Sequence, residues 1–148
     1  MKVIEHSIDI AAPAAAVWDV LIDVDAYAQW NPFLTFDRAP AAVGDHLSIT
    51  IRPGRRTMTF RPTVTAFAPG HEISWLGRLL APGIFDGAHT LVLEPLPNGN
   101  TRFRQREVFR GVLVPFMKSV LGDTSEGFAA INAALATRVH TLAAAGEV

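Results

Sequence analysis

The most regular hydrophobic pattern of the chain lies near its C-terminus, over residues 123–144. Hydrophobic residues recur there at spacings of three and four, at Phe128, Ile131, Leu135, Val139 and Leu142. At about 100° per residue these positions form one stripe, so the pattern predicts a helix with one buried face. Asp123 is placed to cap the start of this helix, and Gly146 lies where the chain would leave it.

Most of the remaining chain alternates between hydrophobic and polar residues, which predicts half-buried strands. The first such segment covers residues 2–10, and six more follow between residues 34 and 110. Turn sequences such as Pro53-Gly54, Pro69-Gly70 and Asn98-Gly99 separate several of them. These short connections predict an antiparallel sheet, with one wet face rich in Thr and Arg and one hydrophobic face toward the C-terminal helix.

Between the first two strands the pattern changes to two short helical segments. Pro13 suits the first position of a helix that continues over residues 14–24. Residues 26–30 form a second turn that ends at Asn31-Pro32, because a residue before proline disfavours the helical region. The sequence therefore predicts one α+β domain over residues 1–148. In it, a curved seven-stranded antiparallel sheet and two short helices pack against a long C-terminal helix and enclose an elongated space.

Composition excludes several classes of function. The chain has no cysteine, which excludes disulfides and thiolate chemistry, and its net charge of -1 argues against a nucleic-acid partner. No hydrophobic run reaches the ~18–20 residues of a membrane span, so we expect no stable membrane insertion. The N-terminus lacks the apolar segment of a signal peptide, which favours a cytoplasmic protein. The five histidines show no metal-ligand spacing, and no phosphate or dinucleotide motif is present. We therefore expect neither a metal nor a cofactor.

The strand over residues 103–110 carries the most informative polar pattern. Alternation places Gln105 and Glu107 on its hydrophobic face, where a polar side chain is costly unless it is hydrogen-bonded or wet. His89 lies on the same face across the hairpin, and Asn132 interrupts the helical stripe. These residues could converge with His6 on one interior space. A carboxylate near a histidine suits acid–base chemistry but also a structural pair, and we favour structural or ligand-orienting roles.

Two connections are unusually hydrophobic for loops, namely residues 79–85 and 111–117. Two interpretations remain open for them. In the first, they pack on each other as a plug or line a mouth that admits an apolar ligand. In the second, they form the contact of a homodimer.

Four stretches of the sequence resemble the SRPBCC superfamily, and within it the polyketide cyclase/dehydrase-like group. They are Ile10-x-x-Pro13-x-x-x-Val17-Trp18-x-x-Leu21, Asp25-x-x-x-x-Trp30-Asn31-Pro32-Phe33, Val43-Gly44-Asp45, and Thr124-Ser125-x-Gly127-Phe128-x-x-x-Asn132-x-x-Leu135. The resemblance implies a helix-grip fold over a deep cavity, related to START domains and the birch-pollen allergen. Members include lipid and hormone carriers, aromatase/cyclases and ring-hydroxylase subunits. The iron-ligand histidines of the last group have no counterpart here.

Three hypotheses for function follow. In the first, the protein binds a small hydrophobic molecule, lipid-like or aromatic and polyketide-like, between the sheet and the C-terminal helix. The residues expected to contact it are Trp30, Phe33, Met58, Phe60, Trp75, Phe85, His89, Leu91, Phe103, Gln105, Glu107, Phe116, Met117 and Asn132. In the second, a cyclase or dehydratase acts on such a ligand, with His89 and Glu107 as acid–base groups. In the third, the apolar loops bind a protein partner or a second copy.

Overall fold

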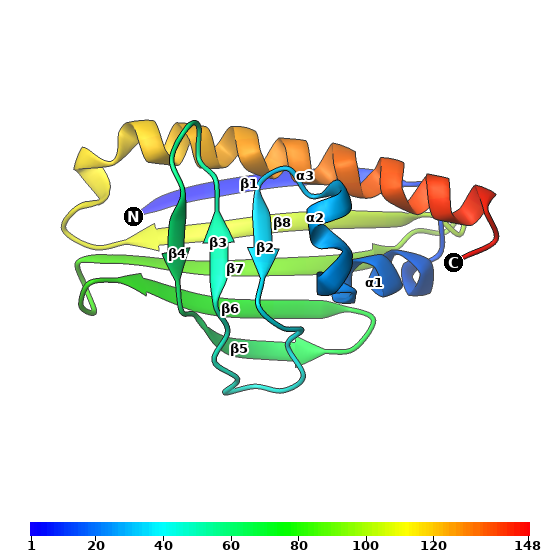
Figure 1. The fold of residues 1–148 in the computed structure, drawn as a ribbon, viewed down its shortest axis with the longest axis horizontal. Helices are drawn as coiled ribbons and strands as arrows, with labels where there is room; N and C mark the ends of the chain where they lie inside the picture. The colour runs from blue at the N-terminus through cyan, green and yellow to red at the C-terminus, as the bar shows by residue number, and fades with distance from the viewer.

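The protein is built from two antiparallel sheets and one long helix (Figure 1). The computed structural model describes residues 1–148. The larger sheet has the strand order β1-β8-β7-β6-β5. Its strands are β1 (Lys2–Ile10), β5 (Thr63–Ala68), β6 (Glu72–Leu79), β7 (Phe85–Pro95) and β8 (Thr101–Arg110).

A second, three-stranded sheet crosses one face of the larger sheet (Figure 1). Its strands are β2 (Leu34–Phe36), β3 (Ile49–Ile51) and β4 (Met58–Phe60). The α+β class, the antiparallel pairing and the long C-terminal helix are confirmed, but the count of seven strands in one sheet is wrong. The alternation of Met58, Phe60, Val64 and Ala66 predicts one continuous strand, but the structure interrupts it at Arg61-Pro62, which separates β4 from β5.

Proline explains that interruption, because it has no N–H to donate to a neighbouring strand. The Pro62 carbonyl instead accepts a hydrogen bond from the Leu47 N–H at 3.0 Å, and the Val64 N–H donates to the Asp45 carbonyl at 2.9 Å. A single bridge between His46 and Thr63 continues this contact. The chain thus leaves the small sheet and enters the large one within a few residues.

The C-terminal helix α3 (Lys118–Ala144) begins earlier than the sequence pattern predicts. A short 3₁₀ turn, η2 (Val114–Phe116), leads directly into it, so the chain is already helical before Asp123 and this residue caps nothing. The apolar stripe is confirmed: Phe128, Ile131, Leu135 and Val139 are buried and Leu142 is half-buried. Gly146 ends the helix region with a φ of 73°, which suits glycine.

The short helical elements pack at the end of the molecule where α3 ends (Figure 1). They are α1 (Ala14–Ile22), the 3₁₀ turn η1 (Val24–Ala26) and α2 (Tyr27–Trp30). The Asn31 side chain then accepts hydrogen bonds from the N–H groups of Phe33 and Leu34 at 3.0 and 2.9 Å, which fixes the exit toward β2. None of the helices has the length and hydrophobicity needed to cross a membrane.

Candidate functional site

A cavity lies between the small sheet, strands β6–β8 and the first half of α3. Its volume is about 60 Å³. One water needs ~10–15 Å³ by this measure and a cavity that binds benzene has ~150 Å³, so the cavity holds a few waters and is too small for an aromatic ring as it stands. Hydrophobic side chains dominate its lining, and His89, Glu107, Thr59 and Thr124 add polar groups.

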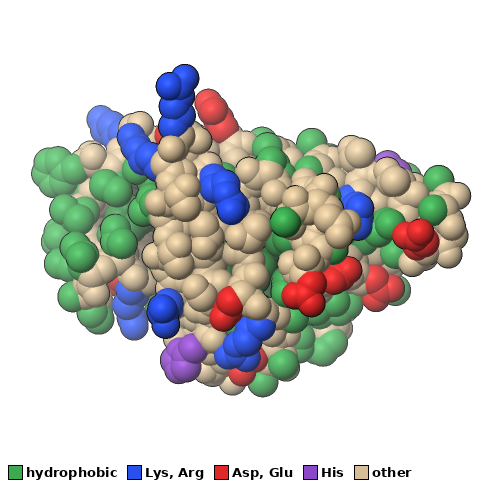
Figure 2. Space-filling view, in the orientation of Figure 1, with side chains coloured by type: hydrophobic (Ala, Val, Ile, Leu, Met, Phe, Trp, Pro, Cys, Tyr) green, Lys and Arg blue, Asp and Glu red, His purple; other side chains and the backbone are tan.

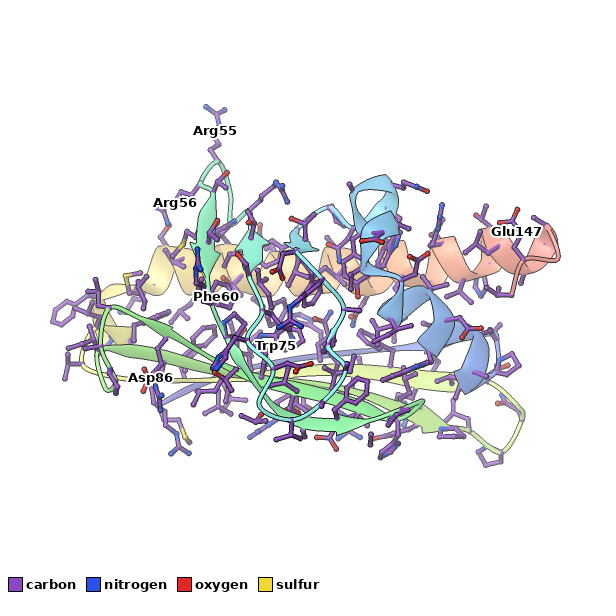
Figure 3. All side chains as sticks on the ribbon, turned by 60° about the horizontal axis from the view of Figure 1, so that its bottom comes forward. Arg55, Arg56, Phe60, Trp75, Asp86 and Glu147 are labelled. Carbon is purple, nitrogen blue, oxygen red and sulfur yellow. The ribbon has the colours of Figure 1, made fainter.

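Two glycines make room for side chains of the cavity lining. Gly77 and Gly87 are paired across β6 and β7, with no side chain on the face toward the cavity. A Cβ atom at Gly77 would lie 2.8 Å from the Phe60 ring, and one at Gly87 would lie 2.5 Å from Glu107 Oε1. In Figure 3 the Phe60 side chain extends from β4 toward the larger sheet. The glycine pair therefore admits both the Phe60 ring and the Glu107 carboxyl.

His89, Gln105 and Asn132 form a buried chain of hydrogen bonds. His89 Nε2 lies 3.2 Å from Gln105 Oε1. Gln105 Nε2 donates to Asn132 Oδ1 at 2.6 Å and to the Phe128 carbonyl at 3.3 Å. All three side chains are at most 3% exposed. These hydrogen bonds join β7, β8 and α3. They therefore hold the helix against the sheet and also fix the position of the imidazole.

Aromatic rings hold the His89 imidazole from both sides. The Phe128 ring stacks on it with centroids 4.6 Å apart and an interplanar angle of 21°. The Trp75 ring meets it edge-on at 4.7 Å. With the hydrogen bond to Gln105, these contacts leave the imidazole a single orientation.

Glu107 is directly opposite His89 in the pairing of β7 and β8. Its carboxyl is buried yet forms no hydrogen bond or ion pair within the protein, and no hydrogen bond joins it to His89. Burial raises the pKa of Glu107 from 4.5 to about 8. Burial also lowers the pKa of His89 from 6.5 to about 3, against the smaller opposite effect of its bond to Gln105. Near pH 7 the cavity thus contains a protonated carboxyl beside a neutral imidazole.

The structure divides the residues predicted to contact a ligand into three groups. Those that line the cavity are Phe33, Met58, Phe60, Phe85, His89 and Glu107. A second space of about 10 Å³, on the other side of His89, is lined by Trp30, Trp75, Leu91, Phe103 and Gln105. Phe116, Met117 and Asn132 line neither space.

His6 does not join the interior polar group. Its Nε2 atom lies 2.9 Å from the Ser125 hydroxyl, at the contact between β1 and α3. In contrast, Gly87, Thr124 and Val120 line the cavity although sequence patterns did not select them. Gly87 shares its alternation with His89, so the period of two contains this signal. Thr124 and Val120 lie four and eight residues before Phe128 in α3. Thr124 is at the start of the predicted helix, and Val120 precedes it.

The two apolar connections lie next to each other at one end of the molecule. Val112 N–H donates to the Gly83 carbonyl at 3.1 Å, and Leu113 N–H donates to the Ile84 carbonyl at 3.0 Å. Leu80 and Phe116 are each 81% exposed. Figure 2 shows hydrophobic side chains gathered at this end. The connections thus pack together through their backbones, and a homodimer contact stays a prediction.

The sequence as a whole matches one protein family. The model of the family described as "Polyketide cyclase / dehydrase and lipid transport" matches residues 1–147. The chain belongs to this family. No curated protein matches it in sequence.

Solved structures of low sequence identity show the same fold. The Zhui aromatase/cyclase from Streptomyces sp. R1128 is 20% identical, with 99% of each chain covered and a TM-score of 0.79. A START superfamily protein from Mycobacterium smegmatis is 21% identical, with 95% of this chain and 98% of that one covered and a TM-score of 0.70. Ara h 8.0201 is 12% identical at the same coverage, with a TM-score of 0.71. The helix-grip fold and the resemblance to the SRPBCC superfamily are thereby confirmed.

Proposed function

We propose that this family member binds a small, mostly hydrophobic ligand, lipid-like or aromatic, in the cavity between the two sheets and α3. The observation that carries the proposal is the cavity itself, a mostly apolar space lined by two paired residues, His89 and Glu107, whose Nδ1 atom and carboxyl have no hydrogen-bond partner in the protein. Binding pockets combine apolar walls with a few placed polar groups in this way. The family description and the structural similarity to an aromatase/cyclase and a START superfamily protein support the same class of function.

The cavity of about 60 Å³ is smaller than a ring needs, so a ligand of that size or larger requires side chains to move. Met58 and Leu79 are half-buried members of its lining. Methionine is unbranched and flexible, so Met58 can change rotamer at low cost. We therefore expect Met58 to be the first side chain that a larger ligand displaces.

Substitution of Thr124 by leucine tests the cavity. The added side-chain volume projects into the space, so we expect the neutral probe N-phenyl-1-naphthylamine to bind at least ~10-fold more weakly to Thr124→Leu than to the wild type. Fluorescence titration of the purified protein measures this affinity. Native mass spectrometry of freshly purified protein would in addition reveal a co-purified small molecule.

Thr141→Leu is the matched control for this experiment. Thr124 and Thr141 both lie in α3, and each hydroxyl donates to the carbonyl four residues earlier, at 2.7 and 2.9 Å. Thr141 is exposed and distant from the cavity lining. We expect its variant to bind the probe like the wild type. Equal affinity of both variants, or no saturable binding by the wild type, would contradict the proposal.

Cyclase or dehydratase chemistry is the second candidate function, because His89 and Glu107 contact the same cavity from opposing strands. A protonated Glu107 is suited to donate a proton to a leaving hydroxyl. A base with a pKa of about 3 is weak at neutral pH, since general bases work best with a pKa near the operating pH. Because His89 is a weak base, we favour ligand binding over catalysis as the function. Conversion of a β-hydroxy ketone that is lost in both His89→Leu and Glu107→Gln would support the enzyme instead.

A further inference from the structure

The orientation of the Gln105 amide is dictated by a helix carbonyl. The Phe128 carbonyl oxygen can only accept, so the Gln105 group 3.3 Å from it must be the NH₂. The second hydrogen of that NH₂ goes to Asn132 Oδ1 at 2.6 Å. Both donors of Gln105 are then used, and its remaining atom, Oε1, faces His89.

This orientation selects one tautomer of His89. Gln105 Oε1 carries no hydrogen, so the imidazole nitrogen 3.2 Å from it, Nε2, must donate. In a neutral imidazole the other nitrogen is then a bare acceptor. His89 Nδ1 has no hydrogen-bond partner in the protein. Trp30 Nε1 and Asp86 Oδ1 are the only side-chain polar atoms sealed without a partner, so Nδ1 is not fully sealed, and the His89 side chain lines the cavity.

The Glu107 carboxyl completes a donor and acceptor pair on the cavity wall. It is opposite His89 on the adjacent strand and also lacks a partner within the chain. No ion pair compensates a negative charge on Glu107. Arg78 contributes to the cavity lining, but its guanidinium is half-exposed and lies 3.8 Å from the Asp86 carboxylate. A buried anion without such a partner is costly, for Glu107 and for a ligand alike.

We infer that Gln105 and Asn132 are positioning residues that hold His89 Nδ1 as a hydrogen-bond acceptor beside the Glu107 carboxyl. The site then selects an uncharged ligand with an N–H or O–H group next to a carbonyl. It rejects a carboxylate such as a fatty acid. The ligand donates to Nδ1, and its carbonyl accepts from the carboxyl of Glu107. The ligand half of this inference rests on the proposed function. The positioning half concerns the protein alone.

The positioning half is tested by the tautomer of His89 in ligand-free protein. Long-range ¹H–¹⁵N spectra of the wild type are expected to show Nε2 protonated and Nδ1 bare near pH 7. In Gln105→Leu we expect the single-tautomer signature to be replaced by averaged nitrogen shifts. A wild-type imidazole protonated at Nδ1, or a mixture of tautomers, overturns the assignment even where Gln105→Leu does not fold.

The ligand half is tested with benzamide and benzoate, which share one ring and nearly one shape. The amide offers N–H beside C=O, whereas benzoate offers only acceptors and a charge. We expect benzamide to displace N-phenyl-1-naphthylamine at least ~10-fold more effectively than benzoate at pH 7, and this ratio to fall toward one in Gln105→Leu.

The outcomes separate the two proposals. Equal displacement by both compounds, or probe binding with no displacement by benzamide, overturns the selectivity while the proposed function stands. Failure of the wild type to bind the probe, benzamide or benzoate defeats the proposed function together with the selectivity. The His89 tautomer then decides the positioning half by itself.

Discussion

Gly127→Ala in α3 is expected to lower the free energy of unfolding by about 2 kcal/mol, the cost of overpacking a filled interior. A Cβ atom at this position would lie 2.3, 2.5 and 2.7 Å from three atoms of the Phe33 ring. Phe33 is only 2% exposed and meets the Phe128 ring edge-on at 6.0 Å. Its backbone N–H is also bonded to the Asn31 side chain, so the ring has little room to retreat.

Gly122→Ala is the matched control in the same helix. A Cβ atom at Gly122 meets nothing within 4 Å, so only the helix propensity changes. Alanine is better than glycine in a helix by up to ~1 kcal/mol, and we expect this variant to be more stable than the wild type. If the two glycine-to-alanine substitutions change the free energy of unfolding in opposite directions, the difference isolates the contact with Phe33 from the backbone effect.

Urea unfolding, followed by circular dichroism, measures both free energies. The double variant Gly127→Ala with Phe33→Leu completes a double-mutant cycle, in which we expect a coupling of about 1 kcal/mol or more because the smaller side chain relieves the clash. Stabilisation by Gly127→Ala, or an additive cycle, would mean that the Phe33 ring does not rest on the helix. Phe33 lines the cavity, so such a result would also change the shape of the site.

Periodicity predicted the elements whose burial is one-sided and regular. The stripe of α3 and the alternation of β1 and β6–β8 are the direct result of packing one face against the other layer. The start of α3 was missed because residues 118–122 contain only two adjacent hydrophobic residues, Val120 and Leu121, which provide no helical period. The break at Pro62 was missed because alternation continues across it, and only the missing N–H of proline marks the change of sheet.

Periodicity likewise predicts only part of the candidate site. Alternation placed His89, Gln105 and Glu107 on one face because it fixes which side of a sheet each residue faces. It does not fix how far along the sheet a helix residue lies. Only the three-dimensional structure shows that Asn132 meets Gln105 rather than the cavity. Phe116 was assigned to the ligand wall on hydrophobicity alone, yet it is 81% exposed on η2.

Glu107 is expected to make the protein less stable as the pH rises from about 6.5 to 8. Its pKa is raised from 4.5 to about 8 in the folded state because the carboxyl is buried. Between these values the unfolded chain has released the proton and the folded chain has kept it, so raising the pH favours unfolding. The stabilisation is complete below pH 4.5 and is lost as the pH rises through the folded-state value. The loss approaches 1.4 kcal/mol per pH unit, or about 2 kcal/mol over this window.

His89 acts in a different window and in the opposite direction. Its pKa is lowered from 6.5 to about 3, so the unfolded chain binds the additional proton and stability falls as the pH drops below 6.5. At pH 6.5 half of the unfolded chains still carry this proton, and the imidazole is almost neutral in both states only about one pH unit higher. The wild type and a variant at Glu107 share this opposite slope, so the difference between them isolates the carboxyl.

Glu107→Gln removes the titrating group while keeping a side chain of similar shape. We expect its free energy of unfolding, from urea titrations at several pH values, to change by about 2 kcal/mol less than that of the wild type across this interval. Glu126→Gln, at an exposed position of α3, is the control and should parallel the wild type. Parallel curves for the wild type and Glu107→Gln would show that the carboxyl is already ionised in the folded protein. In that case it could not donate to a ligand carbonyl, and a carboxylate ligand would face a fixed negative charge instead of a neutral donor.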